Sequence, residues 1–169
     1  MKKMNYLLST GILVFLFVVS FSCDGKKNPQ TDKMVGAWKG KVQFSSGSFA
    51  EVKDLEFMYV FNAGGSMTES SNYDGAPPVP PAYGIWKKTG ENKYEAKYEF
   101  YTANPPSSFE DIKSSGGFSP AGYGVIVEEI TLSDDGNSYI SVVTMARFDK
   151  AGNHAGVSVA EAKVVRMEF

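Results

Sequence analysis

Few residues of this 169-residue chain could do acid–base or nucleophilic chemistry, and they form no cluster along the sequence. The only histidine, His154, stands between Asn153 and Ala155, a setting that favours a turn residue over a metal ligand or a base. Glu128 and Glu129 would point to opposite faces of a strand, so one of them could enter an interior and act as an acid or base. The alternative is a glutamate that faces water, and we predict no catalytic residue.

Other short motifs lack the context that their chemistry needs. The segment 117–121, Gly-Phe-Ser-Pro-Ala, matches only half of a nucleophile elbow and has no predicted helix after it. The carboxylates at 134–137 lack the downstream glutamate of a calcium loop, and Gly64-Gly65 would join two strands rather than open a helix. We therefore expect no metal, no cofactor and no enzyme activity. With 17 basic and 19 acidic residues, we also expect no nucleic-acid partner.

The first 23 residues have the layout of an export signal. Lys2 and Lys3 form a positive start, an uncharged and mostly apolar stretch follows, and small residues then precede Cys23, the only cysteine. A retained membrane anchor is an alternative, because residues 4–22 are uncharged and a spanning helix needs about 20 residues. Free secretion is another.

The segment Ser20-Phe21-Ser22-Cys23, followed by the polar run 24–28, resembles the lipobox of bacterial lipoproteins. This resemblance implies a signal peptide over 1–22, an acylated Cys23 with a polar tether to residue 31, and a domain over 32–169. It also implies attachment to a membrane of the bacterial cell envelope, with the outer membrane as the expected one. The chain from Cys23 onward has 15 basic and 19 acidic residues, a net charge of −4.

The composition after the signal favours strands. From residue 23 onward valine occurs 13 times, whereas leucine occurs only at Leu55 and Leu132, and β-branched and aromatic residues suit strands. Charged and apolar residues alternate over Lys93–Phe100, as in a strand with one solvated face. Similar patterns predict eight strands at about Ala37–Ser45, Val52–Asn62, Ser66–Asn72, Tyr83–Lys88, Lys93–Ala103, Gly122–Leu132, Ser138–Phe148 and Gly156–Glu168.

Short Gly-, Asn- and Asp-rich turns separate most of these strands, which favours hairpins between sequential neighbours. An open sheet of eight strands would leave two exposed edges, and closure removes them. We therefore predict an all-β fold, an eight-stranded antiparallel up-and-down barrel. A two-sheet β-sandwich is the alternative, because alternation alone does not distinguish the two.

The segment Gly36-Ala37-Trp38, which follows a short helical turn near residues 31–35, resembles the opening motif of the lipocalins and related calycin barrels. The later strand Tyr83-Gly84-Ile85-Trp86 is similar to lipocalin-like bacterial domains. The resemblance implies a lipocalin-like barrel in which Trp38 closes the narrow end and Arg166 of the last strand packs over it. Such a cation–π contact contributes roughly 0.5–2 kcal/mol.

A barrel of eight strands has an interior for side chains or for one small ligand. Packing of the core is the simpler role for the aromatic residues. If the interior is open, the expected ligand-binding residues are Phe57, Tyr59, Phe61, Trp86, Tyr94, Tyr98 and Phe100, with Ala160 and Ala162 leaving space. Two loops could cover a mouth: the Pro-rich segment 74–82 and the segment 104–121. The apolar residues of the second loop suggest that it folds back over the barrel end, and a variable surface excursion is the alternative for it.

These features favour a lipid-anchored, non-enzymatic envelope protein whose barrel binds a small apolar or amphipathic ligand. The first alternative is a protein–protein interaction module that recruits an envelope protein through its Pro-rich and aromatic loops. The second is a barrel-type isomerase that acts on a lipid-like substrate through an inward Glu or Tyr.

Overall fold

The computed structural model describes residues 32–73, 80–115 and 117–169. The predicted signal peptide, Cys23 and the tether lie outside the described residues, and so does most of the Pro-rich loop. Among the described residues, no helix is both long and apolar enough to cross a membrane.

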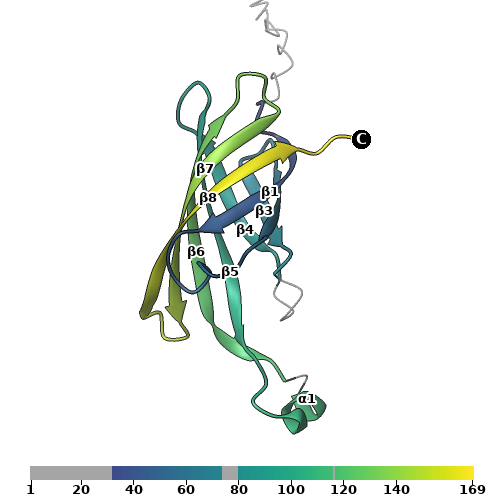
Figure 1. Cartoon of the computed structure of the whole chain (residues 1–169), viewed down its shortest axis with the longest axis vertical. Helices are drawn as coiled ribbons and strands as arrows, with labels where there is room; N and C mark the ends of the chain where they lie inside the picture. Colours follow the sequence, from purple (N-terminus) through teal and green to yellow (C-terminus); the bar gives the residue numbers. More distant parts are fainter. Residues whose placement is uncertain (1–31, 74–79, 116) are drawn as a thin grey trace, which may run out of the picture. The chain divides into compact units, whose positions relative to one another are not determined.

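Eight antiparallel strands form a closed barrel in which each strand pairs with its neighbours in sequence and β1 pairs with β8 (Figure 1). The fold is thus the predicted up-and-down barrel and not a sandwich. The strands are β1 (Gly36–Phe44), β2 (Glu56–Phe61), β3 (Ser66–Ser71), β4 (Ala82–Lys88), β5 (Lys93–Asn104), β6 (Ser119–Leu132), β7 (Ser138–Asp149) and β8 (His154–Arg166), and one helix, α1 (Phe109–Ser115), lies between β5 and β6.

Along each strand, side chains point alternately into the barrel and out of it. In β5, Tyr94, Ala96 and Tyr98 are buried inside the barrel, whereas Lys93 and Lys97 are exposed outside it. This pattern confirms the reading of the sequence. The predicted boundary of β2 was wrong, because the strand begins at Glu56 and the preceding residues form the β1–β2 loop.

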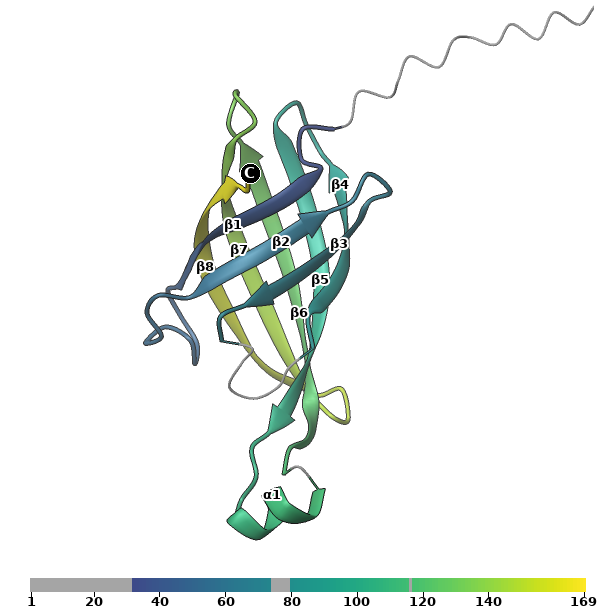
Figure 2. The ribbon, with the colours of Figure 1, turned by 90° about the vertical axis from the view of Figure 1, so that its right-hand side faces the viewer.

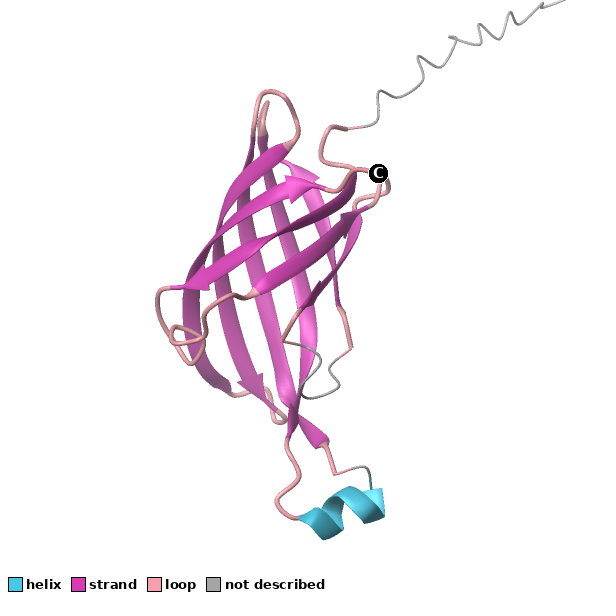
Figure 3. Ribbon diagram, turned by 45° about the vertical axis from the view of Figure 1, so that its right-hand side comes forward, coloured by secondary structure: helices cyan, strands magenta, loops and turns pink. Residues whose placement is uncertain are grey.

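Helix α1 was not predicted. Figures 2 and 3 show β5 and β6 continuing past the barrel as a two-stranded ribbon that carries α1 at its tip. The backbone N–H of Asp111 donates to Ser108 Oγ at 3.2 Å, which caps the helix at its N-terminus. The expected folding of this segment over the barrel end was wrong for its tip, because the Phe109 side chain is 68% exposed.

Candidate ligand pocket

Gly36, Trp38 and Arg166, the residues of the lipocalin resemblance, lie together at one end of the barrel. We call it the closed end because Trp38 and Met34 are fully buried there. Trp38 and Arg166 are cross-strand partners of β1 and β8, and the guanidinium lies 4.1 Å from the centre of the indole ring. The indole N–H donates to the carbonyl oxygen of Met34 at 2.9 Å. Gly36 has a φ of 139°, which L side chains rarely adopt, and a Cβ there would lie 2.6 Å from Arg166 Nη1 and displace the guanidinium.

Hydrogen bonds from Arg166 tie two separate segments to this end. The guanidinium donates to the carbonyl oxygens of Val35 at 3.0 Å and Gly136 at 2.9 Å, and also to that of Lys33. The residues before β1 and the β6–β7 turn are thereby fastened to β8.

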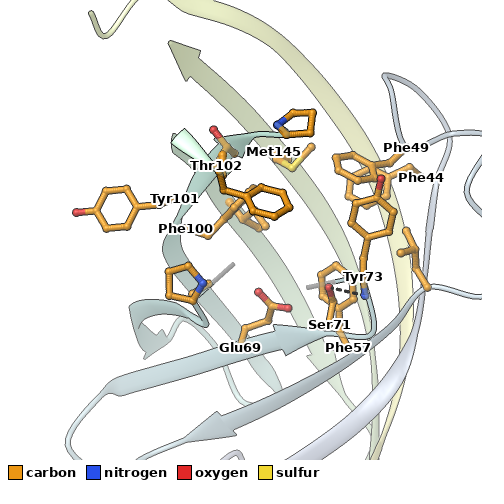
Figure 4. Close-up of a pocket in the computed structure, with 17 residues that line it drawn as sticks. Phe44, Phe49, Phe57, Glu69, Ser71, Tyr73, Phe100, Tyr101, Thr102 and Met145 are labelled. Carbon is orange, nitrogen blue, oxygen red and sulfur yellow. Dashed lines mark hydrogen bonds between the residues drawn. The ribbon is translucent and has the colours of Figure 1, made fainter. Parts of the chain in front are cut away.

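A cavity of about 400 Å³ lies in the other half of the barrel, and its walls are mostly apolar (Figure 4). The lining side chains come from the interior faces of the strands, from the β1–β2 loop and from the base of the β5–β6 ribbon. They are Phe44, Phe49, Leu55, Phe57, Glu69, Ser71, Tyr73, Pro80, Ala82, Phe100, Tyr101, Thr102, Ala103, Pro105, Phe118, Ile126 and Met145.

Two of the seven predicted ligand-binding residues, Phe57 and Phe100, line this cavity. Tyr59, Phe61 and Tyr98 are buried in the packed core, where the rings of Tyr59 and Phe61 are stacked with their centres 6.0 Å apart. The small residues Ala160 and Ala162 are also buried in that core and do not line the cavity.

The other two, Trp86 and Tyr94, pack against each other near the closed end. The Trp86 indole donates to the carbonyl oxygen of Asn62 at 3.0 Å, and the Tyr94 hydroxyl donates to Asp32 Oδ1 at 2.7 Å. Both aromatic residues therefore join the strands to neighbouring segments of the closed end, away from the cavity.

The sequence reading missed Glu69, whose side chain is only 6% exposed and lines the cavity. Side chains of β3 point alternately into and out of the barrel, with Met67 and Glu69 inside. This period of two along the strand therefore predicts an inward Glu69. Figure 4 shows its carboxyl directed toward the space bordered by Phe100 and Tyr73.

A second interior glutamate, Glu128, is fully buried below the cavity floor and is not among the lining residues. It lies two residues beyond Ile126 on the same face of β6, about 7 Å further along the strand. Tyr98 donates its hydroxyl proton to Glu128 Oε2 at 3.0 Å, and Ser141 donates to Oε1 at 2.5 Å.

Burial disfavours the charged form of Glu128 and raises its pKa to about 7, although the hydrogen bonds from Ser141 and Tyr98 act in the opposite direction. Burial, together with the charge of Glu128, also raises the pKa of Tyr139 well above its usual value. The hydroxyl of Tyr139 has no hydrogen-bond partner among the described residues. Of the pair Glu128 and Glu129, Glu128 is thus the residue whose carboxyl lies inside the barrel. Its contacts there are with residues of the core and not with the cavity.

His154 begins β8 and packs its ring edge-on against Phe148, with the ring centres 5.7 Å apart, rather than standing inside the turn. In the part of the chain that the structure describes, no group of three or more His, Cys, Asp or Glu side chains is arranged to hold a metal ion.

The fold and the site define an eight-stranded barrel with one closed end and an apolar cavity in the other half. Neither protein-family models nor curated proteins give a match to this sequence.

Proposed function

We propose that this protein is a lipid-anchored component of the bacterial cell envelope whose lipocalin-like barrel binds a small apolar or amphipathic molecule without catalysing a reaction. The observation that carries the proposal is the cavity of about 400 Å³ with its largely apolar walls. Binding sites for small molecules typically enclose 300–1,000 Å³, are lined by hydrophobic and aromatic groups, and contain a few polar ones.

The packing of the barrel supports this proposal, because the cavity lies beside a solid core. The closed end has the Trp38–Arg166 contact and the hydrogen bonds around it, so an apolar ligand would not need to organise the fold. A preformed cavity lowers the ordering cost of binding.

The pocket is tested by filling it. Ala103 is half-buried in the cavity wall, and Ala103→Trp would place an indole in the cavity. We expect the full chain in lipid nanodiscs to bind radiolabelled 1-octanol in equilibrium dialysis, after correction for empty discs, and Ala103→Trp to lose that binding. The matched control is Ile85→Trp, on the exposed outer face of β4, which should bind as the unaltered chain does. Unchanged binding by Ala103→Trp would refute the pocket as the site.

The lipid anchor is tested separately. In cells fed radiolabelled palmitate, the chain should become labelled and sediment with membranes, whereas Cys23→Ser should lose the label. The cysteine is the only one in the chain, so no other thiol can replace it. A Cys23→Ser protein that still carries the label would contradict the proposed anchor.

The ribbon that carries α1 favours one second candidate, a protein–protein interaction module. Phe109 and Ile112 are 68% and 48% exposed on the helix at its tip. Replacing both with serine should abolish photocrosslinking of an envelope protein from a probe placed at residue 110. Crosslinking that persists in the double variant would exclude this role for the helix.

A further inference from the structure

The cavity has one charged group among its lining residues, the carboxyl of Glu69, within the described part of the chain. Its side chain is more than nine-tenths buried and faces the cavity from β3. Among the described residues, no Lys or Arg lines the cavity.

Aromatic rings surround the space that this carboxyl faces. Phe44, Phe49 and Tyr73 form a continuous wall, with ring centres 5.4 Å apart for the first pair and 5.3 Å for the second. Phe57 lies on β2 and Phe100 on β5, so rings border the carboxyl from several directions (Figure 4). The faces of such rings carry negative electrostatic potential and attract organic cations.

Glu69 also has space in front of it because its cross-strand partner on β4 is Ala82, which lines the same cavity. A larger side chain at residue 82 would fill the volume beside the carboxyl. The carboxyl and the rings therefore border a volume that a ligand head group can occupy.

We propose that the ligand of this pocket is an organic cation with an apolar tail, an alkyl ammonium compound whose positive head group lies beside Glu69 and against the surrounding rings. The cation favours the ionised carboxylate, and the aromatic walls take the methyl or methylene groups next to the nitrogen. A fatty acid would instead place its carboxylate beside the Glu69 carboxylate, and the two like charges would repel each other. This inference rests on the proposed binding function and specifies the ligand class.

The overall charge acts in the same direction. The chain from Cys23 onward has a net charge of −4, which attracts cations and repels anions as they approach. The fit of the head group beside Glu69 supplies the selectivity within the pocket.

Three probes with eight-carbon chains test the proposal: octyltrimethylammonium, 1-octanol and octanoate. Their binding to the full chain in nanodiscs of zwitterionic lipid is measured by equilibrium dialysis, with empty discs as the background. We expect octyltrimethylammonium to bind most tightly and octanoate least tightly. This order is measured on the unaltered chain, so it does not depend on the folding of a variant.

Glu69→Gln keeps the shape of the side chain and removes its charge. Because octyltrimethylammonium has no N–H to donate, only Coulomb attraction draws its head group to the carboxylate, and loss of that charge should weaken its binding at least about tenfold. Binding of 1-octanol should stay within about twofold. The matched control is Glu99→Gln, which removes the same charge from the outer face of β5 next to Phe100 and should change none of the three affinities.

Two results would overturn the proposal: octanoate binding as tightly as the ammonium compound, or equal effects of Glu69→Gln and Glu99→Gln on the ammonium compound. If 1-octanol binds and the cation has no advantage, the ligand class is wrong and the binding function stands. If none of the three probes binds, the binding function itself fails.

Discussion

Replacing Glu128 with glutamine should make the barrel markedly more stable at neutral and alkaline pH. The pKa of Glu128 is about 7 in the folded protein, against its usual value of 4.5. Between these two values the folded chain keeps a proton that the unfolded chain has released. The free energy of unfolding therefore falls as the pH rises, by up to about 1.4 kcal/mol per pH unit.

The full effect is about 3 kcal/mol, reached once the pH exceeds the pKa in the folded state. This contribution to stability is present below pH 4.5 and is lost as the pH rises through 7. Glutamine has no proton to lose, and its amide can accept a hydrogen bond from one hydroxyl and donate one to the other. The Tyr98 and Ser141 hydroxyls thus keep partners in the variant.

The assay is urea unfolding at pH 4.5, 6 and 8, followed by circular dichroism and tryptophan fluorescence so that two-state behaviour is checked. The stability of Glu128→Gln relative to the unaltered chain should increase by about 3 kcal/mol from the lowest pH to the highest. Other carboxylates contribute equally to both proteins and cancel in this difference. Glu129→Gln, on the exposed face of the same strand, is the control and should follow the unaltered chain. A difference between Glu128→Gln and the unaltered chain that stays flat across the range would refute the assignment of a buried, proton-binding Glu128.

Three further substitutions probe the barrel. Tyr98→Phe removes a hydrogen bond that stabilises the ionised Glu128, so the pKa of Glu128, followed by carboxyl NMR shifts, should move upward; a downward move would contradict the contact. Arg166→Met should lower the free energy of unfolding in urea by about 2–3 kcal/mol, because it removes the stacking on Trp38 and the hydrogen bonds to backbone carbonyls. Lys163→Met, on the outer face of β8, is the control and should lower it little. Equal losses in the two variants would contradict a stabilising role of Arg166 at the closed end. Gly40→Ala would place a methyl group 2.6 Å from Cα of Val164 and should lower the free energy of unfolding by roughly 1–3 kcal/mol. In the control Gly64→Ala the methyl group meets no atom within 4 Å. A Gly40→Ala protein as stable as the unaltered chain would show that the strands can separate there.

The barrel could be predicted because strand alternation is strong and the turns between strands are short. In Lys93–Phe100 every charge falls on one face, which leaves one register for the strand. Helix α1 was missed because seven residues are too few for a helical period. The local signal was Ser108 followed three residues later by Asp111, the pattern of a helix N-cap.

The location of the cavity was harder to predict than the barrel. Alternation shows that Phe57, Tyr59 and Phe61 all face inward, but it does not show at which depth the interior is filled. Tyr59 and Phe61 pack in the core, while Phe57 lies at the cavity. Glu69 was not predicted because charged residues are rarely buried, although its position in β3 is an inward one.

Occupation of the cavity by a small amphipathic molecule is the central claim, and methionine methyl NMR tests it most directly. Met145 lines the cavity, whereas Met34 is equally buried near the closed end. In the full chain with ¹³C-labelled methionine methyl groups, titration with 1-octanol should shift the Met145 signal in a saturable manner and leave the Met34 signal in place. A Met145 signal that does not move, or equal shifts of both signals, would contradict binding in this cavity.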